Sequence, residues 1–282
     1  IEFDKFVSDV KKNDPYYLSP DEEIFDLNRS YLQALVTSAP LLIASGGAGV
    51  GKSHNFKLVA EICDLKQFDP NEDSSEDQDY DWVEAPNPKS EKQFFELLKQ
   101  HNGKTIVFDD ADGIYSDKDT IDLLKKATNP SGRRIVGRGN ESIEFTGQII
   151  SITNKSAAEL TKNEDMKAIF SRADKKDIYF TKEEQLYFIE SRLHDMNFDA
   201  LDRLPNQADD IAEREEVFKI LKDNIDLIDP MKFNSRSLKD AITAKRKSEL
   251  GDEKVKQKGT LALRAFGSGS DWKKNLLREL TK

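Results

Sequence analysis

The chain has 282 residues, of which 34% are charged and 37% hydrophobic, so it can bury one full core and a small second one. Its 53 acidic residues outnumber 43 basic ones and give a net charge of −10. This balance opposes nonspecific binding to nucleic acid or to anionic membranes, and any nucleic-acid contact would need a local basic patch.

The single cysteine, Cys63, cannot form an internal disulfide, which favours a reducing, cytoplasmic setting. The longest apolar run, at residues 34–46, contains Pro40 and is too short to cross a bilayer. No charged-then-apolar leader opens the chain, but it begins at Ile1 rather than at a methionine, so a missing N-terminal domain stays an open alternative. We expect a cytoplasmic protein without a membrane segment.

Apolar periodicity predicts alternating helices and strands in the first part of the chain. Leu27, Tyr31 and Leu35 are spaced as on one face of a helix near residues 22–36. The apolar run "LLIAS" at 41–45 predicts a buried strand, and "KSHNFKLVAEIC" directly after it predicts a helix. The residues expected on the buried face of that helix are Phe56, Val59, Ala60 and Cys63.

The middle of the chain continues the alternation after an acidic, serine-containing stretch that predicts a solvated loop. Ser90 and Gln93 form a Ser-x-x-Gln capping box at the start of one predicted helix. The predicted elements are a strand at 82–85, a helix at 90–103, a strand at 105–112, a helix at 119–128, a hairpin from 133–137 and 142–147, and a strand at 148–154.

After Arg172 the alternation of strand and helix is expected to stop. Helices are predicted at 182–197, with Leu186, Ile189, Leu193 and Met196 on one face, and at about 208–223, 235–248 and 271–281. The expected fold class is α/β, a parallel sheet with flanking helices followed by a small helical domain. The expected boundaries are an approach segment at 1–35, the α/β domain at 36–180 and the helical domain at 181–282.

A glycine-rich loop between the first strand and its helix satisfies G-x-x-x-x-G-K-[ST] with Gly46, Gly51, Lys52 and Ser53. Backbone N–H groups of such a loop surround phosphates, the helix N-terminus favours their charge, the lysine reaches the β and γ phosphates, and the serine hydroxyl binds Mg²⁺. The alternative is a glycine turn with an exposed lysine. The residues expected to bind ATP are Gly46, Gly47, Ala48, Gly49, Val50, Gly51, Lys52, Ser53 and His54.

A phosphate loop needs a carboxylate on a neighbouring strand to hold the metal, and "TIVFDD" supplies one at a strand end. Asp109 is the expected metal-side residue, and Asp110 is expected to orient or deprotonate the attacking water. Acidic residues are also common at turns after strands, so the assignment depends on the phosphate loop.

The chain contains, in this order, the motifs "GGAGVGKS", "IVFDDAD", "ISITN", "FSRAD" and "FNSRSLKDAI". In these motifs it resembles AAA+ ATPases over roughly residues 35–265, and its residue choices resemble most those of small bacteriophage members of that family. The resemblance implies that Asn154 is the sensor that positions water against the γ phosphate. It implies that Arg172 is an arginine finger entering the next subunit's site and that Arg236 is the sensor of a helical lid. Each assignment has an alternative: Asn154 could cap a turn, and Arg172 could form a surface ion pair. Arg214 or Arg246 could take the place of Arg236.

The family resemblance also implies a ring, usually of six copies, with ATP and Mg²⁺ at sites shared between subunits. One departure is Asp110, because the family usually has glutamate there; slow turnover or switch-like use of ATP is therefore an open alternative. Arg133, Arg134 and Arg138 crowd the predicted hairpin, in a region that faces the central pore in several AAA+ branches.

The favoured hypothesis is that this hairpin binds DNA or RNA, as in a helicase loader or a replication or recombination accessory. Pairing with acidic residues or plain solvation of the arginines is the alternative. A remodeller of a protein client and a nucleotide-controlled scaffold with little turnover are the other two function classes. In AAA+ unfoldases, the loop before the second helix usually carries an aromatic residue that grips a peptide in the ring pore. The corresponding loop here, "APNPKSE", has no aromatic residue, which argues against a threading unfoldase.

Overall fold

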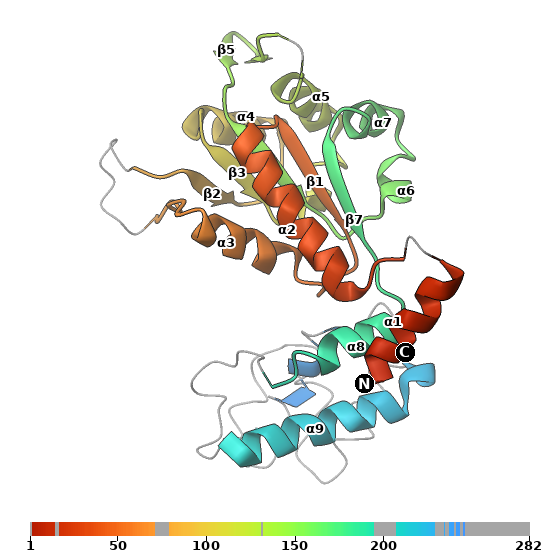
Figure 1. The fold of residues 1–282 in the computed structure, drawn as a ribbon. Coiled ribbons are helices and arrows are strands. Elements are labelled where there is room, and N and C mark those ends of the chain that lie inside the picture. The colour runs from red at the N-terminus through yellow and green to blue at the C-terminus, as the bar shows by residue number, and fades with distance from the viewer. Residues whose placement is uncertain are drawn as a thin grey trace. The chain divides into compact units, whose positions relative to one another are not determined.

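The computed structural model describes residues 2–14, 17–70, 79–130, 132–194, 207–228, 234, 237–239, 241–242 and 245 (Figure 1). The chain divides into two compact units. The first comprises Glu22–Gly47 and Gly51–Tyr179, and the second comprises Ile1–Asp21, Ala48–Val50 and Phe180–Lys282. In the described part of the chain, no helix is long and apolar enough to cross a membrane.

A five-stranded, entirely parallel sheet forms the centre of the first unit. Its strands are β1 (Leu41–Gly46), β2 (Trp82–Ala85), β3 (Thr105–Phe108), β6 (Gln148–Ile152) and β7 (Asp174–Ile178), in the order β2-β3-β6-β1-β7. Every residue of β1 and β6 is buried, as expected for inner strands of a parallel sheet covered on both faces. The predicted strands at 41–45, 82–85, 105–112 and 148–154 are confirmed, although the structure ends the last two earlier, at Phe108 and at Ile152.

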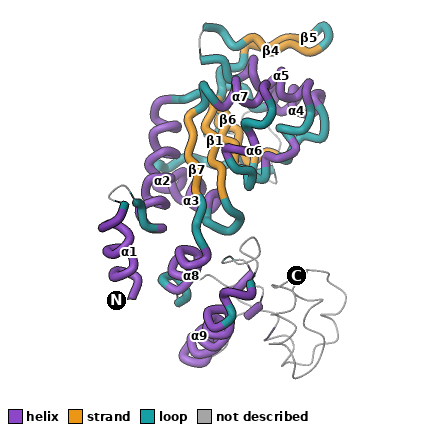
Figure 2. Tube along the Cα trace, turned by 90° about the vertical axis from the view of Figure 1, so that its right-hand side faces the viewer, coloured by secondary structure: helices purple, strands orange, loops and turns teal. Residues whose placement is uncertain are grey.

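Helices cover both faces of this sheet. They are α2 (Pro20–Thr37), α3 (Lys52–Ile62), α4 (Glu91–Gln100), α5 (Lys118–Ala127), α6 (Ala157–Leu160) and α7 (Glu164–Phe170). Figure 2 shows α2 on one side of the sheet and α4, α5 and α7 on the other. Edge-to-face ring contacts join Tyr31 of α2 to Phe56 of α3, and Phe56 to Trp82 of β2. The opposite face packs Phe94, Phe95 and Phe108 into one core.

The helix ends follow local chemistry that the sequence already contains. Ser90 accepts a hydrogen bond from the backbone N–H of Gln93, as predicted, while the Gln93 side chain accepts from the N–H of Lys89. Asp117 caps α5 in the same way through the N–H of Thr120. The predicted hairpin is confirmed as β4 (Ile135–Arg138) and β5 (Glu141–Glu144), joined at Gly139 and Asn140.

The expectation that strands stop after Arg172 was wrong, because "DKKDI" forms the edge strand β7 against β1. Only Ile178 of this strand is buried, so it lacks the apolar run that marks the inner strands. Two of its polar side chains are paired with neighbouring segments instead: Lys176 with Glu23 of α2, and Asp177 with the Ser45 hydroxyl.

Cys63 also differs from expectation. It follows the last residue of α3 as its C-terminal cap and is only half-buried, whereas Phe56, Val59 and Ala60 are buried as predicted.

The second unit contains the helices α1 (Glu2–Asn13), α8 (Lys182–Glu190) and α9 (Gln207–Asp223) and the short helix η3 (Ile225–Leu227). Leu186, Ile189 and Leu193 share a core with Val217 and Leu221 of α9, which confirms the predicted apolar face of α8 and the helix at 208–223. Residues 237–239 and 241–242 are helical, within the predicted helix at 235–248. Met196 and the predicted helix at 271–281 lie outside the described residues.

Candidate nucleotide site at the carboxyl edge of the sheet

The phosphate loop connects β1 directly to α3. Gly46 ends the strand, residues 47–51 form the loop, and Lys52, Ser53 and His54 form the first turn of the helix, where His54 is exposed. Gly46 has φ 137°, and a Cβ there would lie 2.0 Å from the carbonyl oxygen of Ile178. Gly51 caps α3 at φ 90°. These backbone conformations explain why the motif requires glycine at both ends.

Lys52 is buried and folds back on its own loop. Its Nζ donates to the carbonyl oxygens of Gly46 at 2.9 Å and Gly47 at 2.7 Å, and to Asn154 Oδ1 at 3.2 Å. Burial lowers the pKa of Lys52 from 10.5 to about 8, and the nearby carboxylates of Asp109 and Asp110 oppose that shift. The ammonium group is therefore held between uncharged carbonyls and an acidic cluster.

The metal-side residues lie together as the sequence predicts. Ser53 Oγ donates to Asp109 Oδ1 at 2.8 Å, joining the first turn of α3 to the end of β3. A hydroxyl and a carboxylate at this distance fit Mg²⁺, which prefers oxygen ligands and is usually held by one or two protein groups together with substrate phosphates. The described residues contain no cluster of three or more His, Cys, Asp or Glu side chains that would form an all-protein metal site.

Asp110 and Asn154 are also in contact, although they follow different strands. Asn154 Nδ2 donates to Asp110 Oδ1 at 2.9 Å. Asp110 has φ 53°, a left-handed conformation that Asp tolerates better than most residues and that is often found at functional sites. The carboxylate is thus positioned by a turn and by the amide of the neighbouring strand.

Three further residues contribute to the site, although the sequence alone did not assign them to it. Asn87 Nδ2 donates to the carbonyl oxygens of Asp109 at 2.7 Å and Asp110 at 3.0 Å, and so supports the acidic turn. The buried hydroxyl of Tyr31 donates to the carbonyl oxygen of Lys52 at 3.1 Å. Asp177 of the edge strand adds to the negative field around Lys52. Only Asn87 had a sequence signal, because it is a polar residue just after a parallel strand.

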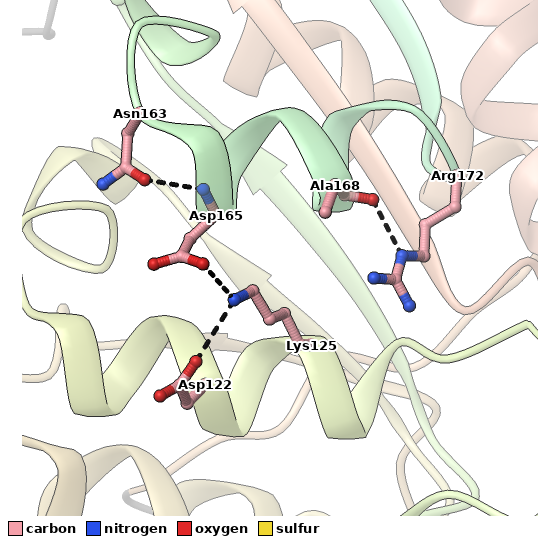
Figure 3. Close-up of polar contacts among 6 residues, drawn as sticks. All are labelled: Asp122, Lys125, Asn163, Asp165, Ala168 and Arg172. Carbon is pink, nitrogen blue, oxygen red and sulfur yellow. Dashed lines mark hydrogen bonds and ion pairs between the residues drawn. The ribbon is translucent and has the colours of Figure 1, made fainter.

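Arg172 follows α7 and is exposed (Figure 3). Its Nε donates to the carbonyl oxygen of Ala168 at 2.8 Å, and its two terminal nitrogens have no partner among the residues that the structure describes. At the other end of α7, Asn163 caps the helix and Asp165 pairs with Lys125 of α5 at 2.6 Å. Arg172 is therefore presented by a helix anchored at its far end. Arg236 lies outside the described residues.

Each of the three hairpin arginines has a partner within the chain. Arg133 pairs with Glu144, and Arg138 pairs with Glu91 at 3.1 Å; both pairs are partly or fully exposed and so contribute little stability. Arg134 donates to the carbonyl oxygens of Ala127 and Gly147 and stacks over the ring of Phe145. The guanidinium of Arg134 is therefore part of the hairpin's own structure.

No protein-family model and no curated protein sequence match the chain. Among solved structures, NtrX from Brucella abortus in complex with ADP is 14% identical with a TM-score of 0.49 over 89% of this chain, which spans 56% of the length of that one. The replication initiator DnaA bound to AMPPCP and single-stranded DNA is 10% identical with a TM-score of 0.39, covering 90% of this chain and 85% of that one. Rhizobiales Trip13 is 12% identical with a TM-score of 0.34, covering 99% and 82%.

At these identities and TM-scores we base no conclusion on the three likenesses. The chain's own geometry is more specific: a strand, a glycine loop and a helix share a parallel sheet with β3, which lies one strand away, beyond β6, and is followed by two aspartates. We conclude that the chain has the fold and the phosphate loop of a P-loop NTPase, as its resemblance to AAA+ ATPases predicts.

Proposed function

We propose that this protein binds and hydrolyses ATP with Mg²⁺. The observation that supports this best is the convergence of Lys52, Ser53, Asp109, Asp110 and Asn154 within hydrogen-bonding distance at one edge of the sheet. The five come from three separate segments of the chain. A glycine turn with an exposed lysine would not account for a buried Lys52 surrounded by acidic groups.

The roles follow from the chemistry of each group. The N–H groups of the loop and the start of α3 bind phosphate oxygens, and Lys52 exchanges its contacts with Gly46 and Gly47 for the β and γ phosphates. Ser53 and Asp109 would hold Mg²⁺, which would neutralise the negative charge that develops on the phosphates during hydrolysis.

Asp110 orients and deprotonates the attacking water, and the amide of Asn154 keeps that carboxylate in place. The aspartate is one methylene shorter than the glutamate usual in AAA+ ATPases, so we expect slow turnover.

The active form that we favour is a ring of several copies, with six preferred, in which Arg172 enters the site of the next subunit. The support is its geometry: Arg172 is exposed, one guanidinium nitrogen is anchored to Ala168, and the other two have no partner among the described residues. A fixed donor aimed at the transferring phosphoryl group lowers the barrier. The lid role of Arg236 remains part of the same proposal.

The macromolecule that is remodelled is proposed to be a nucleic acid in the ring. Because Arg134 is committed to the hairpin, contact with phosphates would depend on Arg133 and Arg138, whose exposed ion pairs can be exchanged. A protein client or a scaffold role with little turnover are the alternatives. Stimulation of the ATPase rate by DNA distinguishes the nucleic-acid hypothesis from the protein-client hypothesis. Tight ATP binding without turnover identifies the scaffold role.

The test is the steady-state ATPase rate against protein concentration, with and without single- and double-stranded DNA, for the wild type, Lys52→Ala and Arg172→Ala. We expect a rate that rises more steeply than concentration, is lost in both variants and increases with DNA. A rate that ignores DNA but needs Arg172 supports the protein-client alternative. Turnover that persists in Lys52→Ala would overturn the ATPase proposal.

A further inference from the structure

We propose that Asp112 and Thr153 are positioning residues that hold Asn154 in register with Asp110. This inference rests on the proposed ATPase function and extends it from the groups that face the phosphates to the pair that orients one of them. Neither residue belongs to the phosphate loop or to the metal-side pair.

Thr153 fixes the backbone on both sides of Asn154. Its side chain is fully buried; Oγ1 donates to the carboxylate of Asp112 and accepts from the N–H of Lys155 at 3.1 Å. The N–H of Thr153 donates to the carbonyl oxygen of Ala44 in β1 at 3.0 Å. The residues before and after Asn154 are thus tied to one buried hydroxyl, and that hydroxyl is tied to the acidic turn.

Asn154 needs such support because its own side chain is exposed and is not fixed by packing. Its amide has a defined polarity: Oδ1 accepts from Lys52 and Nδ2 donates to Asp110. Both bonds depend on the position of the backbone at the end of β6. An error of about 1 Å at a reacting group can cost on the order of 10²-fold in rate.

A second cross-link lies farther along the strand, at a greater distance from Asn154. The Tyr115 hydroxyl is hydrogen-bonded to Ser151, which lies two residues before Thr153 and therefore on the same face of β6. Asp112 and Tyr115 both belong to the segment that follows β3, so one partly buried and one buried contact join this segment to β6 and the residue directly after it. The Tyr115 contact is farther from Asn154 and provides a matched control.

The test compares Thr153→Val, Thr153→Ser and Tyr115→Phe in the full chain. Valine keeps the shape of threonine but has no hydroxyl, and serine restores the hydroxyl. We expect Thr153→Val to lower kcat by about ten- to a hundredfold with little change in the KM for ATP, and Thr153→Ser to recover most of it. Tyr115→Phe should lower the melting temperature and leave kcat near that of the wild type.

Equal losses of kcat in Thr153→Val and Tyr115→Phe would overturn the proposal, because they would show a general structural effect. If Thr153→Val does not fold, Asp112→Asn keeps an acceptor of the same shape and should give a smaller loss of kcat. An unchanged kcat in Asp112→Asn would contradict the proposal that Asp112 and Thr153 position Asn154.

The positioning role is separable from the ATPase proposal. Side-chain amide resonances of ¹⁵N-labelled protein, recorded without nucleotide, report the hydrogen bonds of Asn154 whether or not ATP is hydrolysed. We expect the Asn154 amide to shift toward a solvent-exposed value in Thr153→Val and to return in Thr153→Ser. If the wild type lacks Lys52-dependent turnover, the ATPase proposal fails; an Asn154 resonance that Thr153→Val leaves in place overturns the positioning role independently.

Discussion

The amide of Asn154 donates to Asp110 Oδ1 at 2.9 Å, although the two residues are 44 positions apart in the chain. The same amide accepts from the buried ammonium of Lys52 at 3.2 Å. Asn154 therefore bridges the residue that is expected to contact the phosphates and the one that is expected to activate water. This bridge forms because β3 and β6 are neighbours in the parallel sheet and end at the same edge.

Replacing Asn154 by alanine should lower kcat for ATP hydrolysis by about 10²-fold, because one fixed donor beside the reacting group is lost. ATP binding should change little, since Lys52 and the loop remain. The measurement is kcat and KM beside the binding of a fluorescent ATP analogue. Asn102→Ala is the control: it removes an amide that binds the hairpin backbone at Glu144 and Thr146, and kcat should be unaffected. A loss of binding equal to the loss of kcat would contradict the role.

The lowered pKa of Lys52 predicts a pH dependence of ATP binding. Because burial lowers this pKa from 10.5 to about 8, about half of the nucleotide-free protein has lost this proton near pH 8 and most of it at higher pH, whereas bound phosphates favour the charged form. ATP binding should take up a proton there, and affinity should fall by up to about tenfold per pH unit. Calorimetry in buffers of different ionisation enthalpy measures the proton uptake.

Lys52→Arg is the control for that measurement, since arginine stays charged throughout this range. Its affinity for ATP, even if weaker, should not follow the same pH dependence. Equal slopes in the wild type and in Lys52→Arg would assign the effect to another group.

Two glycine substitutions should differ sharply in their effect on stability. Gly46→Ala would place a Cβ 2.0 Å from the carbonyl oxygen of Ile178, at φ 137°, so β1 and β7 would have to separate. Gly139→Ala, at φ 57° in the hairpin turn, has no atom within 4 Å of the added Cβ. We expect about 1 kcal/mol of destabilisation for Gly139→Ala and several times that for Gly46→Ala, measured by urea unfolding. Similar losses would show that the β7 contact is unimportant.

Mixing two inactive variants tests whether the site is shared between copies. Arg172→Ala subunits keep a complete phosphate loop, and Lys52→Ala subunits keep the arginine. If Arg172 enters the neighbouring site, equal mixtures should recover about a quarter of the wild-type sites, because one interface in four pairs the two intact halves. The control is a mixture of Lys52→Ala with Lys52→Arg, which should show no more ATPase activity than the two variants measured separately. Absence of recovery, with co-assembly shown by light scattering, would remove Arg172 from the shared site.

Much of the first unit could be predicted from local patterns. The phosphate loop, the apolar strands and the helices with Ser or Asp caps have short-range causes: backbone conformation at glycine, continuous apolar runs and side chains that bind the first free N–H groups. Asp109 and Ser53 could also be paired in advance, because parallel strands and their following helices meet at one edge of the sheet. The predicted contact between them is present at 2.8 Å.

What the sequence alone determined is thus the motif, the α/β alternation and the residues expected at the sheet edge. Only the tertiary structure decided that the charged segment "DKKDI" is an edge strand, since its stability comes from hydrogen bonds to β1 and from ion pairs to α2 rather than from its own apolar content. The same holds for Asn87, Tyr31 and the contact of Asp112 with Thr153. Each joins segments distant in sequence through one or two polar contacts. Such contacts leave no periodic pattern, because they depend on the register of strands that meet only in the folded chain.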